Sequence, residues 1–312
     1  MPGLAVETQG LGKTFASVEA LRSLDLTVRE GEMFGLVGPD GAGKTTTIRM
    51  LCGILKPTSG RAHVLGYDLE TQGQEIKNHI GYLSQKFSLY GDLTVDENIE
   101  FFAEIHFVDD FRKRRDELLE FTRLTPFRKR LADKLSGGMR QKLALACTLI
   151  HTPRLIFLDE PTTGVDPVSR RDFWKILSSL LRSGITIIMT TPYMDEAERC
   201  SRVGLLSGGR LLAADTPQGV KSLMRGTVIE IVCPEIRRAF AVLKSLPGLR
   251  EVQLFGDRLN VVVDEAEKKT ALVEAALADA GIPVIQKRVL PPSLENVFIS
   301  VTQSVPSEAG HA

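Results

Sequence analysis

The sequence has few cysteines, no long apolar run and no excess charge of either sign, and each absence narrows the class of protein. Its four cysteines are Cys52, Cys147, Cys200 and Cys233. They form no C-x-x-C pair, so their spacing argues against a zinc site or disulfide framework and indicates reduced, buried thiols. No apolar run approaches the roughly 18 residues that span a bilayer, and the N-terminus lacks a secretory signal pattern. We therefore expect a cytoplasmic chain unless a partner brings it to a membrane.

Charge and composition are those of an ordinary soluble globular protein. Lys and Arg together number 39, as do Asp and Glu, so no overall field attracts nucleic acid and we expect no nucleic-acid partner. Apolar residues make up 43% and charged residues 25% of the 312 residues. This is enough for one large or two smaller domains, each with a sizeable core.

The most informative segment is a glycine-rich stretch over residues 38–46. It reads Gly38-Pro39-Asp40-Gly41-Ala42-Gly43-Lys44-Thr45-Thr46. An apolar run over residues 33–37 precedes it and predicts a strand, and residues 48–52 after it predict a helix. Strand, glycine-rich turn and a helix opening with Lys-Thr form the context in which a G-x-x-x-x-G-K-[ST] match indicates a phosphate loop.

Each part of this loop has a chemical reason. Glycines allow backbone N–H groups to surround phosphate oxygens, and the helix N-terminus adds partial positive charge. Lys44 can reach the β- and γ-phosphates, and the Thr45 hydroxyl can hold Mg²⁺. The Asp40 carboxylate would repel phosphate, so we expect it to face solvent in the turn. The segment predicts binding of a nucleoside triphosphate.

Two further strand ends carry polar side chains suited to such a site. A buried strand over residues 154–158 ends in Asp159 and Glu160, and burying paired acids is unfavourable unless they bind a cation or do chemistry. Asp159 would bind Mg²⁺ and Glu160 would act as general base toward water. The strand over residues 80–84 runs directly into Gln85, whose amide would lie either in the site or in a surface loop.

The remaining patterns are weaker taken alone. Residues 4–8 and 24–28 alternate as half-buried strands, and Phe15 between them would stack on a base or, as general burial tendencies favour, lie in the core. From Asp92 the pattern becomes helical, with a capping box at Thr94. Ser136, Gly137 and Gly138 precede a helix over residues 140–150, and form either a second anion-binding N-terminus or a plain cap.

In their order along the chain, these motifs resemble the nucleotide-binding domain of ATP-binding-cassette (ABC) transporters. The resemblance covers residues 4 to about 224 and rests on five motifs. They are Walker A at residues 38–45, the glutamine loop at Gln85, the signature at residues 135–139, Walker B at residues 155–159 followed by Glu160, and the aspartate loop at residues 164–167.

The resemblance implies an α/β P-loop NTPase core with a helical subdomain over about 93–150. It implies a head-to-tail dimer in which Ser136, Gly137 and Gly138 of one subunit close on ATP held by Lys44 of the other. The expected ATP ligands within one chain are Phe15, which becomes the adenine-stacking residue, Gly38 to Thr46, Gln85 and Asp159. Mg²⁺ would be bound by Thr45, Gln85 and Asp159, and Gln85 would link the site to a membrane partner.

Two departures from the family pattern stand out. Met139 replaces the usual Gln of the signature, next to an intact Ser and two glycines. Pro192 occupies the position where the family carries a His that contacts the γ-phosphate. A Pro also suits the first position of a helix, but here a donor to a charged oxygen is missing, a contact worth about 1.5–3 kcal/mol. This motivates the hypothesis of a slowly hydrolysing subunit that pairs with a His-bearing partner.

After residue 224 the pattern restarts as a second domain over residues 225–303. Its expected order is β-α-β-β-α-β, the ferredoxin-like α+β motif. It closes with Pro291-Pro292-Ser293-Leu294-Glu295-Asn296-Val297-Phe298, which resembles the daunorubicin-resistance type of ABC ATPases. We expect a dimer-stabilising or regulatory module, with a small-molecule sensor as the alternative, and a flexible tail over residues 304–312.

These expectations combine into one function and its rivals. The chain would be the ATP-hydrolysing subunit of an exporter for drug-, lipid- or polysaccharide-type cargo, held peripherally on the inner face of the cell membrane by a separate membrane-spanning permease. It would work as a homodimer or as a heterodimer with another ABC ATPase domain. The rivals are a weakly hydrolysing member of a heterodimer and a non-transport ABC ATPase acting on ribosomes or DNA. The latter type carries tandem cassettes or long coiled-coil insertions, which this sequence lacks.

Overall fold

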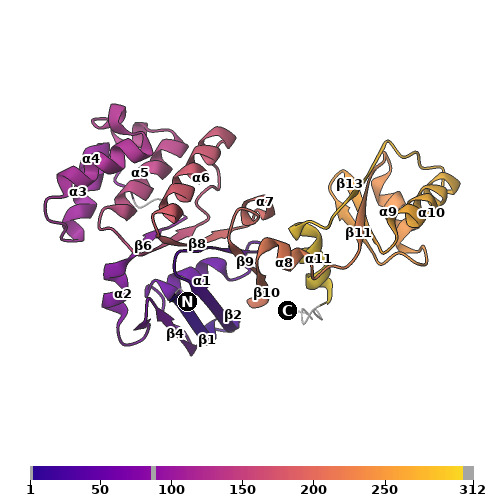
Figure 1. Ribbon diagram of the computed structural model, residues 1–312, viewed down its shortest axis with the longest axis horizontal. Helices are drawn as coiled ribbons and strands as arrows, with labels where there is room; N and C mark the ends of the chain where they lie inside the picture. Colours follow the sequence, from indigo (N-terminus) through magenta and orange to yellow (C-terminus); the bar gives the residue numbers. More distant parts are fainter. Residues whose placement is uncertain (1–2, 86–88, 305–312) are drawn as a thin grey trace. The chain divides into compact units, whose positions relative to one another are not determined.

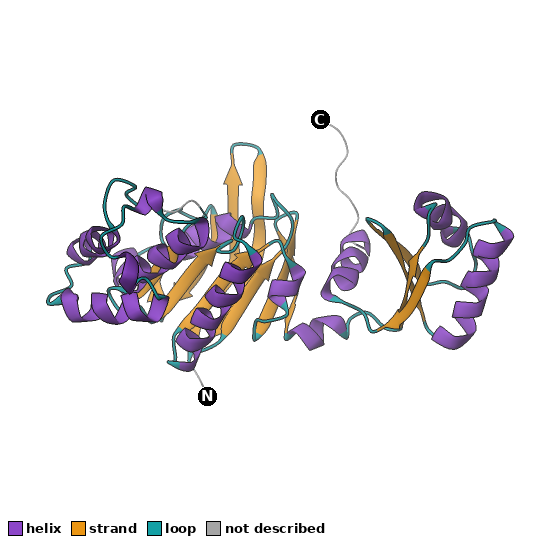
Figure 2. Cartoon of the chain, turned by 90° about the horizontal axis from the view of Figure 1, so that it is seen from above, coloured by secondary structure: helices purple, strands orange, loops and turns teal. Residues whose placement is uncertain are grey.

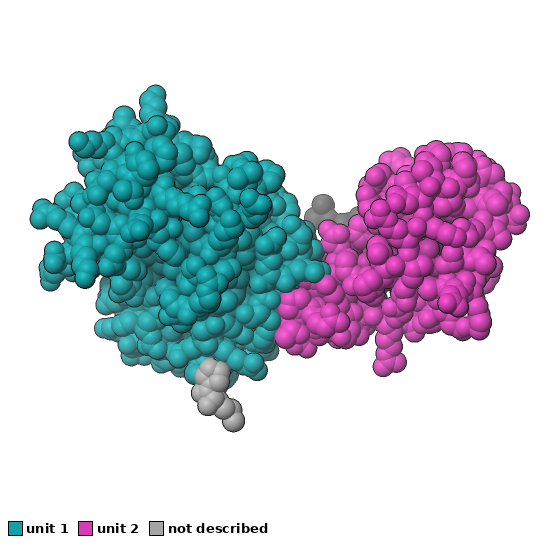
Figure 3. Space-filling view, turned by 45° about the horizontal axis from the view of Figure 1, so that its top comes forward, with its two compact units in different colours: residues 1–214 teal, residues 215–312 magenta. Residues whose placement is uncertain are grey.

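The computed structural model describes residues 3–85 and 89–304. The chain divides into two compact units, Met1–Ala214 and Asp215–Ala312, which Figure 3 draws in different colours. Of the expected tail over residues 304–312, residues 305–312 lie outside the described part of the chain, and Ser304 ends the last helix. No described helix is long and apolar enough to cross a bilayer.

The first unit is built around a six-stranded sheet with the order β10-β9-β3-β8-β7-β6 (Figure 1). Strands β9, β3, β8, β7 and β6 pair in parallel. The strands are β3 (Met33–Val37), β6 (Ile80–Leu83), β7 (Leu155–Asp159), β8 (Thr186–Thr191), β9 (Arg202–Ser207) and β10 (Arg210–Asp215). Every residue of β3, β7 and β8 is buried, as the continuous apolar runs of a parallel sheet require.

A second, antiparallel sheet has the order β2-β1-β4-β5. It contains β1 (Leu4–Phe15), β2 (Val18–Arg29), β4 (Ser59–Val64) and β5 (Tyr67–Asp68). The first two strands are longer than the sequence pattern indicated, because the β1–β2 register shifts at several points between Leu4 and Thr14. Such irregularities break the strict alternation of apolar and polar residues by which strands are recognised.

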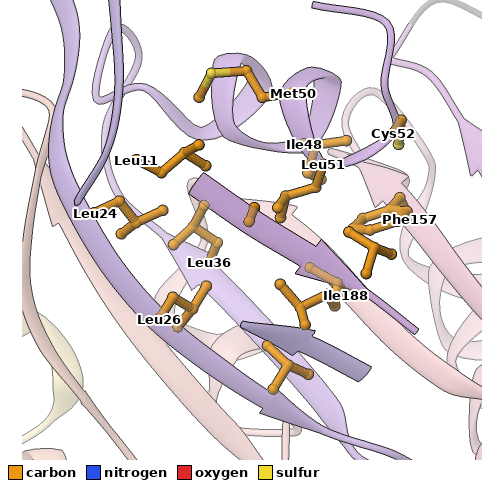
Figure 4. Packing of buried hydrophobic residues seen from close by; sticks show 14 of the residues in the cluster. Leu11, Leu24, Leu26, Leu36, Ile48, Met50, Leu51, Cys52, Phe157 and Ile188 are labelled. Carbon is orange, nitrogen blue, oxygen red and sulfur yellow. The ribbon is translucent and has the colours of Figure 1, made fainter. Parts of the chain in front are cut away.

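Helix α1 (Lys44–Leu51) packs its apolar side chains into a core shared by both sheets. In Figure 4, Ile48 and Leu51 of α1 lie with Leu36 of β3 and Phe157 of β7, and Leu24 of β2 completes the cluster. All five side chains are essentially fully buried. This packing holds the turn before α1 at the carboxyl end of β3.

The expected helical subdomain is present between β6 and β7. It contains α3 (Val95–Ile105), α4 (Phe111–Thr122) and α5 (Gly137–Leu149), with short 3₁₀ turns at Thr125–Phe127 and Ala132–Lys134 (Figure 1). The capping box at Thr94 is confirmed, since its side chain accepts from the Glu97 N–H and the Glu97 carboxylate accepts from the Thr94 N–H. Helix α5 begins at Gly137, three residues before the expected start, because the Ser136 side chain caps it.

The other helices of this unit are α2 (Gly73–His79), α6 (Pro167–Arg182) and α7 (Met194–Ala197). Asp166 caps α6 through its carboxylate, which accepts from the N–H groups of Val168 and Ser169. Helix α7 follows an N-cap at Tyr193. Pro192 therefore lies before the cap and not at the first helical position, where its fixed φ would have been favourable.

The second unit confirms the β-α-β-β-α-β order. An antiparallel sheet with the order β12-β13-β11-β14 carries α9 and α10 on one side and α11 on the other (Figures 1 and 2). Its elements are α8 (Pro217–Lys221), β11 (Thr227–Val232), α9 (Ile236–Lys244), β12 (Glu251–Phe255), β13 (Arg258–Val263), α10 (Ala266–Asp279), β14 (Gln286–Leu290) and α11 (Leu294–Ser304). Helix α8 packs against α11 and belongs to this unit, although the sequence pattern placed residues up to 224 in the first domain.

Candidate nucleotide-binding site

The glycine-rich turn opens onto a pocket of about 640 Å³ at the carboxyl end of the parallel strands. Asp40 to Thr46 line one wall, and Asp40 is exposed in the turn before α1. The remaining wall residues are Ala20, Gln85, Glu160, Thr163, Pro192 and Tyr193. The volume lies in the range of small-molecule and cofactor sites.

The backbone of the turn requires glycine at two positions. A side chain at Gly38 would place its Cβ 2.0 Å from the carbonyl oxygen of Leu206, and one at Gly43 would lie 2.6 Å from that of Ala20. Gly43 also has a φ of +103° and is the N-cap of α1, where no side chain caps the helix. The first N–H groups of α1 are therefore left for a ligand, which makes this end of the helix a site for an anion.

Lys44 is held inside the site by three oxygen atoms. Its Nζ donates to the carbonyl oxygens of Gly38 at 2.8 Å and Pro39 at 3.0 Å. The same nitrogen forms an ion pair with Glu160 Oε1 at 3.3 Å, and both side chains are buried. Gly38 and Pro39 thus shape the site through their carbonyls and are not part of the pocket wall. A bound phosphate would offer the ammonium group stronger, charged acceptors.

Asp159 and Thr45 form the part of the site suited to a divalent cation. Asp159 Oδ1 accepts from the hydroxyls of Thr45 at 3.0 Å and Thr190 at 2.7 Å. Its other oxygen, Oδ2, is buried without a hydrogen-bond partner among the described residues. An unpaired buried carboxylate oxygen is unfavourable by itself, and it is the kind of ligand that Mg²⁺ takes together with phosphate oxygens. The described residues contain no cluster of three His, Cys, Asp or Glu that could hold a metal.

Glu160 is fixed by the backbone and by its neighbours. Its φ of +49° is uncommon for a residue with a side chain, and its N–H donates to the Thr190 hydroxyl at 2.9 Å. Gln85 Nε2 donates to Glu160 Oε2 at 3.0 Å, and Thr163 Oγ1 lies 3.4 Å from the same oxygen. The structure therefore brings together Lys44, Gln85 and the adjacent pair Asp159 and Glu160 from three separate segments.

The other residues that the sequence placed at the nucleotide site lie outside the pocket of their own chain. Phe15 ends β1 with 46% of its surface exposed and Lys13 Nζ 5.1 Å from its ring centre. The core position, which was the alternative to adenine stacking, is therefore wrong, and the stacking role stays a prediction. Ser136, Gly137 and Gly138 form the N-terminus of α5, where the Ser136 hydroxyl accepts from the Met139 N–H at 3.4 Å. The pocket wall therefore contains neither Phe15 nor any of Ser136, Gly137 and Gly138.

Sequence reasoning missed three wall residues. Thr163 lies one turn after Glu160 and Tyr193 directly follows Pro192, so proximity to a motif was a usable signal for both. Ala20 carries no signal in the sequence, because it reaches the pocket only through the fold of β2.

The four cysteines are buried and free, as the sequence predicted. Burial, and to a smaller degree the Asp159 carboxylate, raise the pKa of the Cys52 thiol well above its usual value.

A phosphate loop between a buried parallel strand and a helix, facing an acidic pair on a nearby strand, is the nucleotide site of the P-loop class of proteins. Comparison with known proteins narrows this class. Residues 21–163 match the family model described as ABC transporter, and residues 216–302 match the model described as ATP-binding protein DrrA1-3-like, C-terminal domain.

Two relatives illustrate the similarity. The chain is 38% identical over 309 residues to the daunorubicin resistance ATP-binding protein DrrA2 of Streptomyces coeruleorubidus, which covers 97% of this chain and 96% of that protein. It is 44% identical over 220 residues to the probable multidrug ABC transporter ATP-binding protein YbhF of Escherichia coli (strain K12), covering 70% of this chain. That match spans only 38% of the length of YbhF.

A solved structure agrees with the fold of the first unit. The ATP-binding cassette MJ0796, in a dimeric post-hydrolysis state bound to ADP and Pi, superposes with a TM-score of 0.62 at 26% identity. The superposition covers 68% of this chain and 98% of that one. The chain belongs to the ATP-binding proteins of the ABC transporter family and carries a DrrA-type C-terminal domain. The resemblance inferred from the five motifs and the expected fold are confirmed.

Proposed function

We propose that this chain binds ATP with Mg²⁺, hydrolyses it, and powers an exporter through a separate membrane-spanning permease. The observation that carries the proposal is the Oδ2 atom of Asp159, which is buried without a hydrogen-bond partner in the described part of the chain. The other oxygen of Asp159 accepts from Thr45, and the neighbouring Glu160 pairs with Lys44. This arrangement is what a magnesium–triphosphate ligand needs, because the cation satisfies the carboxylate while the lysine and the N-terminus of α1 bind phosphate.

The residues of this chain would divide the reaction between them. Lys44 would exchange its carbonyl partners for β- and γ-phosphate oxygens, and Thr45, Asp159 and Gln85 would hold Mg²⁺. Mg²⁺ would supply positive charge to the phosphate oxygens as the bond between the β–γ bridging oxygen and the γ-phosphorus breaks. Glu160 would orient a water and accept its proton as the water oxygen bonds to the γ-phosphorus, releasing ADP and phosphate.

A second cassette would complete the site. Ser136, Gly137 and Gly138 form a capped helix start outside the pocket of their own chain, with Gly137 exposed and open space beside it. We infer that they close on the nucleotide of a partner cassette in a head-to-tail dimer. Support comes from the dimeric state of MJ0796. Phe15, exposed at the end of β1, would stack on adenine.

Cargo and location follow from the relatives. The names of DrrA2 and YbhF refer to daunorubicin resistance and multidrug transport, which favours a drug-like cargo for this chain over a lipid or a polysaccharide. The described part of the chain has no helix that could cross a membrane, so a permease would hold it at the inner face of the cell membrane. The domain matched over residues 216–302 would stabilise the dimer or regulate it.

The proposal is tested by steady-state ATP hydrolysis of the purified chain with Mg²⁺, beside a Glu160→Gln variant. Losing the general base should lower turnover by roughly 10²–10⁴-fold where chemistry limits the rate. ATP affinity should persist, since Lys44 and the loop remain. A chain that binds no ATP would contradict the proposal.

One observation favours a second candidate, a weakly hydrolysing subunit of a heterodimer. Pro192 lines the pocket and offers no donor at a position where the family carries a His. The same measurement separates the two candidates. Turnover well above that of Glu160→Gln supports an active homodimer, whereas equal turnover with intact ATP binding supports a partner cassette that performs the hydrolysis.

A further inference from the structure

The segment after β8 presents two residues to the pocket, Pro192 and Tyr193. Pro192 has neither an N–H group nor a polar side chain. The Tyr193 hydroxyl is thus the one side-chain donor that this segment can offer to a ligand. This hydroxyl forms no hydrogen bond with any described residue, and 36% of the Tyr193 surface is exposed. The hydroxyl is available to a bound molecule.

The ring of Tyr193 is held in place from two sides. Its backbone N–H donates to the Thr191 hydroxyl at 3.0 Å and fixes the residue as N-cap of α7. The Arg170 guanidinium, from α6, lies over the ring at 4.9 Å from its centre. A cation over an aromatic face restrains the ring while leaving the hydroxyl at the edge unengaged.

Arg170 is in turn anchored by a buried carboxylate. Glu196 is 1% exposed, and its Oε1 lies 3.4 Å from Arg170 Nε. Its two oxygens also accept from the hydroxyls of Thr162 at 2.5 Å and Thr191 at 2.8 Å. A buried carboxylate with three partners has a fixed position. Glu196 therefore ties the segment after Glu160 to the segment that carries Tyr193.

The position of Tyr193 relative to the phosphate site follows from the strand ends. The backbone N–H of Glu160 donates to the Thr190 hydroxyl, so β8 ends beside the residue whose carboxylate pairs with Lys44. The terminal phosphate of a nucleotide held by Lys44 would lie at this end of the pocket.

We propose that the Tyr193 hydroxyl donates a hydrogen bond to the terminal phosphate of bound ATP, with Arg170 and Glu196 as positioning residues for its ring. The inference rests on the proposed function and deepens it. ADP lacks the phosphate that this hydroxyl contacts, so Tyr193 makes the site prefer ATP over ADP. Because Glu196 also binds Thr162, the same contact links the terminal phosphate to the segment before α6.

The test is the affinity of the full chain for ADP and for a non-hydrolysable ATP analogue, each with Mg²⁺, measured by calorimetry. Tyr193→Phe removes only the hydroxyl, and should weaken binding of the triphosphate by roughly ten- to a hundredfold while leaving ADP affinity unchanged. The same change at Tyr90, which is 46% exposed and outside the pocket wall, should alter neither affinity. Adding Pro192→His to Tyr193→Phe supplies a neighbouring donor and should restore part of the preference.

Arg170→Lys tests the positioning role, because it keeps a cation near Glu196 but loses the planar group that stacks on the ring. It should lower the ratio of ATP-analogue to ADP affinity in the wild type and have no effect on that ratio in Tyr193→Phe. An equal effect in both backgrounds would overturn this role.

Two further results would overturn the inference, and they differ in whether the proposed function fails as well. If the wild type binds both nucleotides and Tyr193→Phe leaves both affinities unchanged, or weakens both equally, the hydroxyl does not contact the terminal phosphate and the inference is overturned alone. If the wild type binds neither nucleotide, the proposed function fails and the inference fails with it.

Discussion

At the scale of single residues, the site depends on buried polar atoms whose partners come from distant parts of the chain. Within the described part of the chain, Asp159 has one hydrogen-bonded oxygen and one without a partner. Glu160 is held at a positive φ by Thr190. Neither arrangement stabilises an empty site, since an unpaired buried oxygen and a left-handed backbone are both unfavourable. Unfavourable arrangements of this kind are typical of functional sites.

A partly buried histidine, His151, lies outside the site and gives the protein a pH dependence. The His151 ring stacks on His106 with centres 3.9 Å apart, and its Nε2 lies 2.9 Å from the carbonyl oxygen of Ile80. Its Nδ1 is buried and has no hydrogen-bond partner among residues 3–85 and 89–304. Burial, with a smaller contribution from the charge of His106, lowers the pKa of His151 to about 4.

This lowered pKa predicts a loss of stability in mild acid. The unfolded chain binds the proton near pH 6.5 and the folded chain only near pH 4, so stability is full above pH 6.5 and falls as the pH drops between these values. The loss between pH 7 and pH 5 should be about 1–2 kcal/mol, measured by chemical denaturation. His151→Gln should remove it, whereas the same change at exposed His63 should not. An identical pH profile for His151→Gln would contradict this account.

At the scale of elements, the phosphate loop is a junction that packing holds rigidly. Helix α1 is anchored through Ile48 and Leu51 in the core, and the chain before it passes against the backbone of β9 at Gly38. The close approach leaves no space for a side chain, so the shape of the anion site is part of the fold of the central sheet.

This close approach predicts a specific sensitivity. Gly38→Ala would place a Cβ 2.0 Å from the Leu206 carbonyl oxygen, forcing the backbone to shift and lowering stability by about 1–3 kcal/mol. ATP affinity should fall with it, because the Gly38 carbonyl and the loop N–H groups move. Gly73→Ala is the matched control, since Gly73 begins α2 with nothing within 4 Å of the added Cβ. It should leave thermal stability and nucleotide affinity intact; equal damage from both would argue against the steric explanation.

At the scale of the whole molecule, the described residues of each unit include a hydrophobic core that belongs to that unit alone. One contains Leu51 with the strands around α1, and the other contains Leu277 between the sheet of the second unit and its helices α9 and α10. On the opposite face of that sheet, buried Gln253 and Asn296 pair their amides at 2.7 Å and fix α11. Each unit thus has the means to unfold cooperatively by itself.

Because each unit has a core of its own, we expect two thermal unfolding transitions whose midpoints can be lowered separately. Leu277→Ala should destabilise the second unit by about 2–5 kcal/mol, and Leu51→Ala the first unit by a similar amount. Calorimetry should show each variant lowering a different transition. A non-hydrolysable ATP analogue with Mg²⁺ should raise only the transition that Leu51→Ala lowers, because the ligand binds that unit alone. Both transitions shifting together in either variant would show that the units unfold as one.

The sequence by itself determined the class of this protein. A phosphate loop, an acidic strand end and a glutamine after a strand each bear their chemistry in adjacent residues, so a local pattern identified Lys44, Gln85, Asp159 and Glu160. The order of the second domain was also readable, since its strands and helices are short and regular.

Only the tertiary structure decided which of these residues meet and what surrounds them. It exposed Phe15 to solvent and brought Ala20 and Tyr193 to the pocket wall. It also left Asp159 Oδ2 without a partner among the residues that the structure describes. It also anchored Arg170 on Glu196 across two helices. The physical reason is that local patterns reflect interactions between neighbours along the chain. The environment of a buried polar group, in contrast, depends on strand order and packing between segments far apart in sequence.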